Sequence, residues 1–171
     1  IILQILRQFC TFAGIMRMTL ITVGKTVVPW VKEGLDDYAG RLRHYVPFVI
    51  REIPELKAAK SLSEEQIKEK EGSLILKAAG SSEIILLDEH GRQYRSVEFA
   101  AWLREKLSHA SRDFCFVIGG AYGFSPEVYA KASGRISLSP MTFNHQMVRM
   151  IFAEQLYRAF TIMKGEPYHH E

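Results

Sequence analysis

From Met18 onward, short β-rich runs alternate with helical stretches, and this alternation limits the chain to few folds. We expect strands at 19–23, 47–53, 83–89, 113–118 and 135–139. We expect helices from Pro29 to Leu42, from Ser61 or Ser63 to Gly80, over 96–110 with Ser96 as cap, from Pro126 onward, and over 146–163. Such alternation is typical of βαβ units. The sequence therefore predicts an α/β fold with a parallel sheet, as a single domain over 18–171.

The first 17 residues do not fit this pattern, although they are apolar. Ala13 and Gly14 allow a degenerate signal peptide as an alternative, but no basic region precedes the apolar residues. We therefore interpret 1–17 as an N-terminal extension outside the fold. Elsewhere no stretch approaches the ~20 uncharged apolar residues of a membrane helix, so no membrane association is expected.

Charge and cysteine usage narrow the class of protein further. A net charge of +3 permits contact with a polyanion without indicating a surface that coats nucleic acid. The two cysteines, Cys10 and Cys115, have no metal-ligand or disulfide spacing, which favours a reducing cytoplasm, with Cys115 as a buried free thiol. No His, Cys, Asp and Glu set has zinc-like spacing, so we expect no metal.

Ligands of parallel sheets bind beyond the carboxyl ends of the strands, here at 87–88, 119–120 and 138–145. A dinucleotide site would require G-x-G-x-x-G after the first strand, where this chain has a single glycine, Gly24. "GKT" at 24–26 resembles the end of a phosphate-binding loop, but the earlier glycine of that motif is absent. Both nucleotide-binding interpretations are therefore disfavoured.

The loop "GGAYG" at 119–123 has two interpretations. Its glycines could supply only the positive φ angles of a tight turn. They could also allow a ligand to lie against the backbone, and "LSPMTFNH" at 138–145 offers apolar walls with Ser139 and Thr142 as polar groups. Together these two loops favour a pocket for an adenosine moiety.

Several motifs occur in order along the chain: "ITVGK", "LLDEHGRQYRSVEFA", "FVIGGAYGFSP", "SLSPMTFNHQMVRMIFAEQLYRA" and "PYHHE". In this combination the sequence resembles the RlmH family of SPOUT-class methyltransferases. The resemblance implies a SPOUT fold with a deep C-terminal trefoil knot, which is an exception to the rule against threaded chains. It also implies a homodimer that uses S-adenosylmethionine to methylate N3 of a pseudouridine in 23S ribosomal RNA within assembled ribosomes.

The resemblance also assigns site residues. Those implied for the cofactor are Leu87, Gly119, Leu138, Ser139, Pro140, Met141, Thr142 and Phe143. The catalytic candidates are Arg149, which could stabilise a deprotonated base, and His145, Tyr168 and His169, which could position the substrate or transfer a proton. Without the resemblance, Arg149 would be a surface or dimer-interface arginine, and Tyr168 and His169 part of a frayed tail.

Two other functions stay open at this point. One is methylation of another RNA, such as tRNA, by a SPOUT-like enzyme. The other is a ribosome-associated binding protein without catalytic activity. At position 170 the family frequently has Arg or Lys, whereas this chain has His170. This departure argues against an RNA contact that requires a permanent charge at that position.

Overall fold

The computed structural model describes residues 16–56 and 61–170, which form one parallel sheet with helices on both faces. The strands are β1 (Met18–Val23), β2 (Phe48–Ile53), β3 (Glu83–Gln93), β4 (Phe114–Ile118) and β5 (Gly134–Ser137). The helices are α2 (Pro29–Leu42), α3 (Glu64–Ala79), α4 (Ser96–His109), α5 (Pro126–Lys131) and α6 (Met147–Lys164). The predicted parallel α/β sheet is thus confirmed.

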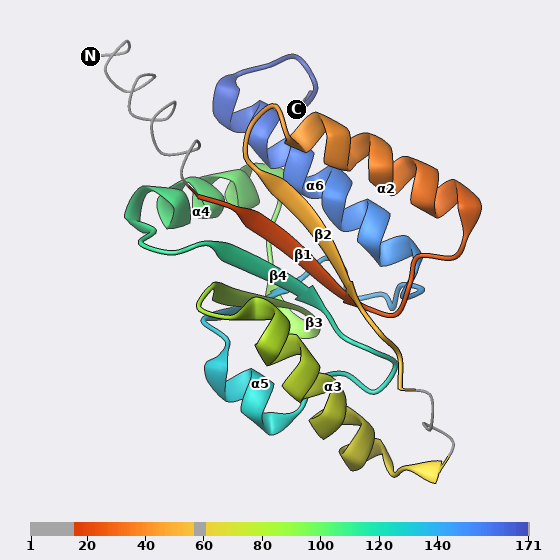
Figure 1. The fold of residues 1–171 in the computed structure, drawn as a ribbon. Coiled ribbons are helices and arrows are strands. Elements are labelled where there is room, and N and C mark those ends of the chain that lie inside the picture. Colours follow the sequence, from red (N-terminus) through yellow and green to blue (C-terminus); the bar gives the residue numbers. More distant parts are fainter. Residues whose placement is uncertain (1–15, 57–60, 171) are drawn as a thin grey trace.

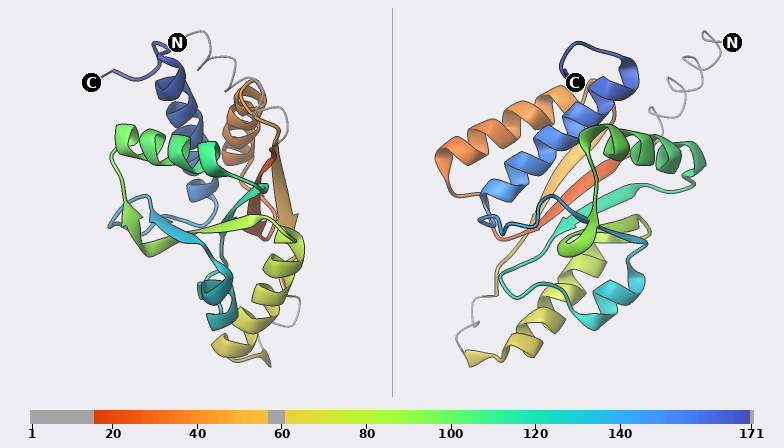
Figure 2. Two further views of the ribbon diagram at one scale, coloured as in Figure 1. Left: turned by 90° about the vertical axis from the view of Figure 1, so that its left-hand side faces the viewer. Right: turned by 180° about the vertical axis from the view of Figure 1, so that it is seen from behind.

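The sheet has the order β2-β1-β4-β3-β5, and all of its pairs are parallel. Figures 1 and 2 show α2, α4 and α6 on one face and α3 and α5 on the other. Alternate residues of β1 serve the two faces: Leu20 packs with Phe116 and Phe152 in one core, and Ile21 packs with Val128 in the second. β1 is therefore buried on both sides, as expected for a central strand of a covered parallel sheet.

Local sequence signals explain where most helices begin. Ser63, rather than Ser61, caps α3, and Gln66 completes a capping box with it. Ser125 caps α5, whose first residue is proline. The prediction for α4 was wrong by one residue, because Ser96 is the first helical residue and the cap position belongs to Arg95. The Glu98 side chain accepts a hydrogen bond from the Arg95 amide, so Glu98 provides the start signal there.

Strand β3 is longer than predicted and is irregular. It pairs with β4 up to Leu87 and then continues to Gln93, with a register shift between Leu87 and Arg92. Ile136 of β5 is opposite both of those residues, so the chain makes an excursion at 88–91 and returns to β5. At this crossing the backbones are very close: a Cβ on Gly91 would lie 2.5 Å from the carbonyl carbon of Ile136. Only glycine fits there without displacing a backbone.

The boundary of the proposed N-terminal extension also shifts. Residues 1–15 lie outside the described residues, as does Cys10, but Met16 is buried in the core beneath α2, α4 and α6. The Arg17 carbonyl accepts a hydrogen bond from the Phe114 amide. Met16 and Arg17, which the sequence assigned to the extension, thus pack with the fold. Cys115 is a buried free thiol, as expected, and burial raises its pKa to about 12. Over the described ranges, no helix is long and apolar enough to cross a membrane.

Candidate functional site

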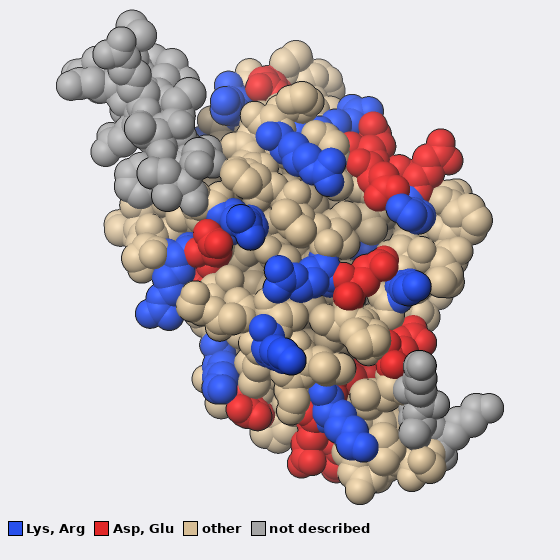
Figure 3. Space-filling model, viewed as in Figure 1, with Lys and Arg blue, Asp and Glu red and all other residues tan. Residues whose placement is uncertain are grey.

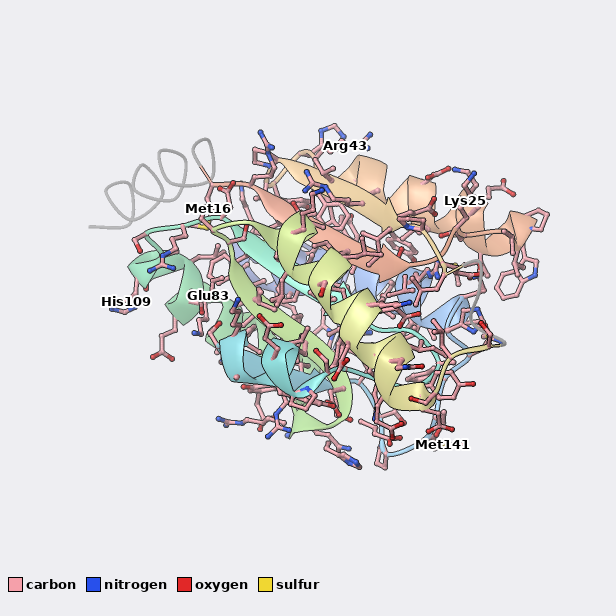
Figure 4. All side chains as sticks on the ribbon, turned by 60° about the horizontal axis from the view of Figure 1, so that its bottom comes forward. Met16, Lys25, Arg43, Glu83, His109 and Met141 are labelled. Carbon is pink, nitrogen blue, oxygen red and sulfur yellow. The ribbon has the colours of Figure 1, made fainter. Side chains whose placement is uncertain are left out.

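The predicted cofactor loops meet at the carboxyl edge of three neighbouring strands. Leu87 of β3 is paired with Ile118 of β4 on one side and with Ile136 of β5 on the other. Gly119 directly follows Ile118, and Leu138 comes two residues after Ile136, so adjacent strands bring the three segments predicted to bind the cofactor together. Figure 4 shows Lys25 and Met141 at this end of the molecule, and Glu83 and His109 at the opposite end.

Leu87 does not occupy the position that the sequence predicted. It was expected at the end of its strand, but β3 continues to Gln93. Leu87 instead marks the point where pairing with β4 stops, and its partly buried side chain packs against the core. The excursion at 88–91 begins immediately afterwards, with the Asp88 carboxylate accepting a hydrogen bond from the His90 amide.

The loop from Leu138 to Phe143 is held by its own serines. The Ser137 hydroxyl donates to the Ser139 carbonyl, and the Ser139 hydroxyl accepts from the Met141 amide at 2.9 Å. The side chains of Met141 and Phe143 are left 78% and 37% exposed. Ser139, which the sequence predicted to be a polar group for the ligand, thus fixes the turn. The exposed side chains of Met141 and Phe143 are apolar groups of the kind that contact the faces of an adenine ring.

In the glycine loop, two glycines have different structural roles. Gly123 has φ +79°, and its amide donates to the Gly120 carbonyl, so the turn interpretation applies to it. A Cβ at Gly119 would lie 3.0 Å from the Phe124 ring, so Gly119 allows this ring to pack under the loop. The group that lies close to Gly119 in this structure is therefore the Phe124 ring. Tyr122 is exposed at the tip of the loop.

Arg149 is buried, which contradicts its interpretation as a surface arginine. Its guanidinium donates to the carbonyls of Val23 and Gly24, at 2.7 and 3.0 Å, to the Thr26 hydroxyl and to the His145 carbonyl. Burial lowers the pKa of Arg149, and the fields of Glu52 and Glu55 act in the opposite sense. The side chain thus ties the end of β1 to the start of α6.

Sequence reasoning missed two residues that complete this connection. The buried Gln146 side chain donates to the Lys25 carbonyl and accepts from the Val27 amide. The buried Thr26 hydroxyl accepts from Arg149, so "GKT", which was dismissed as a phosphate motif, has a structural role. No local sequence signal identified Gln146, whose partners lie about 120 positions earlier in the chain.

The tail residues Tyr168 and His169 lie beside the middle of α6. The Tyr168 hydroxyl donates to the Glu154 carboxylate at 3.1 Å and is 3.3 Å from the Tyr38 hydroxyl, while His169 Nδ1 is 3.5 Å from the Arg158 guanidinium. Burial, with these two partners, raises the pKa of Tyr168 well above its usual value. The tail is therefore packed in place by specific contacts and is not frayed.

The four catalytic candidates consequently form two groups within one chain. His145, which is exposed, and Arg149 lie at the start of α6, next to the cofactor loops. Glu154, which holds Tyr168, is nine residues beyond His145 along the chain, or roughly 13 Å at helical rise. Within residues 16–56 and 61–170, no three His, Cys, Asp or Glu side chains gather in a way that could hold a metal ion.

Comparison with known proteins identifies the family of this chain. Residues 16–169 match the family model described as a predicted SPOUT methyltransferase. The chain therefore belongs to the SPOUT methyltransferase family. Among solved structures, a probable methyltransferase from Bordetella pertussis covers 90% of this chain and 98% of its own, with a TM-score of 0.49 and 12% identity.

Curated relatives narrow the family. A protein of Phocaeicola vulgatus is 52% identical over 157 residues, and one of Bacteroides fragilis is 53% identical over 157 residues. Each match covers 91% of this chain and 100% of the relative. Both relatives carry the name ribosomal RNA large subunit methyltransferase H. The resemblance to the RlmH family is thereby confirmed.

Proposed function

We propose that this protein transfers a methyl group from S-adenosylmethionine to N3 of a pseudouridine in 23S ribosomal RNA, in the cytoplasm. The observation that carries the proposal is the convergence of Leu87, Gly119 and the 138–143 loop at one edge of the sheet, in a chain of the SPOUT methyltransferase family. Ribosomal RNA as the substrate class follows the names of the relatives. The C-terminal trefoil knot stays a prediction from the family.

The residues at this edge fit the cofactor. An adenosine moiety requires apolar walls and backbone polar groups, and the loop offers exposed Met141 and Phe143 on a backbone fixed by Ser137 and Ser139. Bound S-adenosylmethionine supplies a methyl group on a positively charged sulfur. The loops contribute orientation, because an in-line displacement is fast only when the two reacting atoms are held in line.

The substrate nitrogen must lose its imide proton before or during methylation. His145 is exposed beside the cofactor loops and is our candidate for substrate positioning or proton transfer. Arg149 has its donors directed at carbonyls of the β1 end, so it positions that segment and adds positive charge behind the site. The raised pKa of Tyr168 keeps its hydroxyl protonated, so it serves as a hydrogen-bond donor, next to His169.

A homodimer would resolve the separation of the two groups of catalytic candidates. Large apolar side chains are exposed in segments that follow β1, β4 and β5 at the carboxyl edge: Val27, Trp30, Tyr122, Met141, Phe143 and Met147. The Val27 amide is bonded to Gln146, which precedes Met147, so the starts of α2 and α6 form one apolar surface. We assign this surface to contact with a second copy, whose Tyr168 and His169 would approach the site.

Trp30→Glu is expected to convert the dimer into a monomer, because the charged residue would replace a side chain that is 55% exposed on the proposed interface. Light scattering after size-exclusion chromatography measures the mass directly. Val49→Glu, which changes an exposed side chain on β2, is the matched control and should remain dimeric. Loss of the dimer in the Val49 variant alone would move the interface to the β2 edge.

Recognition of the RNA is expected to depend on the assembled ribosome. Figure 3 shows basic and acidic side chains interspersed on one face of the molecule, without a continuous basic surface there. The net charge of +3 is also modest for a protein that binds naked RNA by charge alone. We therefore favour ribosomal particles over a free stem-loop as the substrate.

The decisive experiment maps labelled methyl groups on ribosomes and on free RNA, next to calorimetric titration with S-adenosylhomocysteine. We expect wild-type protein to bind the product and to methylate ribosomes, and Gly119→Val to lose both, because its side chain would press on Phe124 and distort the loop. Methylation of tRNA instead would support the alternative RNA substrate. Ribosome binding without methylation would support a non-catalytic role, and tight product binding by Gly119→Val would refute the role of the loop.

A further inference from the structure

Glu71 is a buried acidic residue that the proposed reaction does not use. It lies on the inner face of α3, and only 7% of it is exposed. Its Oε2 atom is buried and has no hydrogen-bond partner within the described residues. A buried carboxyl oxygen without a partner is costly, so its retention calls for an explanation.

The carboxyl of Glu71 lies directly against the glycine loop. A Cβ added at Gly120 would overlap Oε2 and lie 3.0 Å from Oε1, so the α-carbon of Gly120 and the carboxyl are in contact. The next residue, Gly72, allows the Ser125 side chain to pack against the helix at the other end of the same connection. Figure 1 shows α3 and α5 together beneath the sheet, so α3 supports the β4–α5 connection from below.

The charge of this carboxyl is set by its surroundings. Burial raises the pKa of Glu71, and the negative field of Glu55 raises it further. Glu55 follows β2 and packs against Gly24. The β4–α5 connection presents Gly120 to Glu71 and Ser125 to the neighbouring Gly72, and neither residue of the connection has a titratable side chain. Among the described residues, Glu55 is thus the charged group that shifts this titration.

We propose that Glu71 is a positioning residue that keeps the glycine loop in its cofactor-binding form only while its carboxyl is neutral. An ionised carboxylate at this place would keep its buried Oε2 oxygen without a hydrogen-bond donor, and solvation of that oxygen would require the Gly120 segment to move away from α3. Because Gly120 adjoins Gly119, that movement would disturb the cofactor wall. The proposal rests on the proposed function for its effect on binding, but not for the movement of the loop.

The first test measures the affinity for S-adenosylhomocysteine by calorimetry from about pH 4.5, the ordinary pKa of a glutamate carboxyl, up to about pH 8.5. The sign follows from the raised pKa: the neutral form dominates at low pH, so affinity should fall as pH rises, by about fivefold or more. Glu71→Gln keeps the shape of a neutral carboxyl and should retain the low-pH affinity throughout. Glu69→Gln, an exposed change on the same helix, should follow the wild type. Equal pH profiles for wild type and Glu71→Gln would overturn the proposal.

Two further measurements distinguish the proposal from a merely structural role of Glu71 and from a failure of the proposed function. Glu55→Gln removes the nearby negative charge, so the midpoint of the pH profile should move to lower pH. In the ligand-free protein, the amide resonances of Gly120 and Gly123 should titrate in wild type and not in Glu71→Gln. If neither wild type nor any variant binds S-adenosylhomocysteine, the proposed function fails. The glycine resonances still test the role of Glu71 in that case, because amides that do not titrate in wild type would overturn the proposal.

Discussion

Gly91→Ala is expected to destabilise the protein by about 3 kcal/mol and to weaken cofactor binding more than tenfold. The added Cβ would lie 2.5 to 2.7 Å from the backbone of Ile136 and Ser137, which cannot move as a flexible side chain does. Displacement of β5 would be carried into the 138–143 loop that follows it. Urea denaturation and calorimetry with S-adenosylhomocysteine, both at fixed protein concentration, measure the two effects.

The chain provides a matched control in Gly40→Ala. Gly40 lies in α2, where an added Cβ has no neighbour within 4 Å. This substitution should stabilise the protein by roughly 0.5–1 kcal/mol, because alanine favours helix and glycine does not. A loss at Gly91 no larger than about 1 kcal/mol would show that the two backbones separate easily at the crossing.

Arg149→Met should lower the free energy of unfolding by about 3–5 kcal/mol. The methionine fills much of the same volume, but the carbonyls of Val23 and Gly24 and the Thr26 hydroxyl lose their buried donor. The cost of burying the charge, visible in the lowered pKa, offsets part of this loss. Chemical denaturation measures the change, and methyl transfer at saturating cofactor reports whether the reaction also slows.

Two variants bracket this expectation. Arg149→Lys keeps the charge but not the planar set of donors, so it should fall between wild type and Arg149→Met. Arg104→Met removes an exposed arginine, whose guanidinium is bonded to the Met163 carbonyl, and should change stability by less than about 1 kcal/mol. An Arg149→Met variant as stable as the Arg104 variant would contradict the anchoring role.

The elements with local signals were predictable from sequence. Ser63 with Gln66, and Ser125 before Pro126, are helix starts encoded within a few residues. The end of β3 was not predictable, because its continuation to Gln93 depends on pairing with β5, which is formed some forty residues later in the chain. The residues after Leu87 are polar and resemble a loop, but pairing with β5 makes them part of the strand.

Some features of the candidate site could likewise be predicted from the sequence, and others could not. The convergence of Leu87, Gly119 and Leu138 follows from a rule of parallel sheets, so sequence could anticipate it. The environment of Arg149 could not be anticipated, since its partners include main-chain carbonyls that lie up to 126 positions away. Glu71 has the same difficulty: on α3 it reads as one more charge of a solvated face, and only the packing of Gly120 against it reveals its burial.

The strand order also constrains the timing of folding during synthesis. β2 follows β1 closely in the chain, so these two strands can pair early in synthesis. The other edge of β1 has no partner until β4 is made, because Met18 pairs with Phe114. At ~5–20 residues per second, that edge stays unpaired for roughly 5–20 s on each new chain. The exposed row of main-chain amides and carbonyls is the kind of surface to which aggregating chains add. The order of the strands thus makes the nascent chain vulnerable at its first strand until most of the protein has been made.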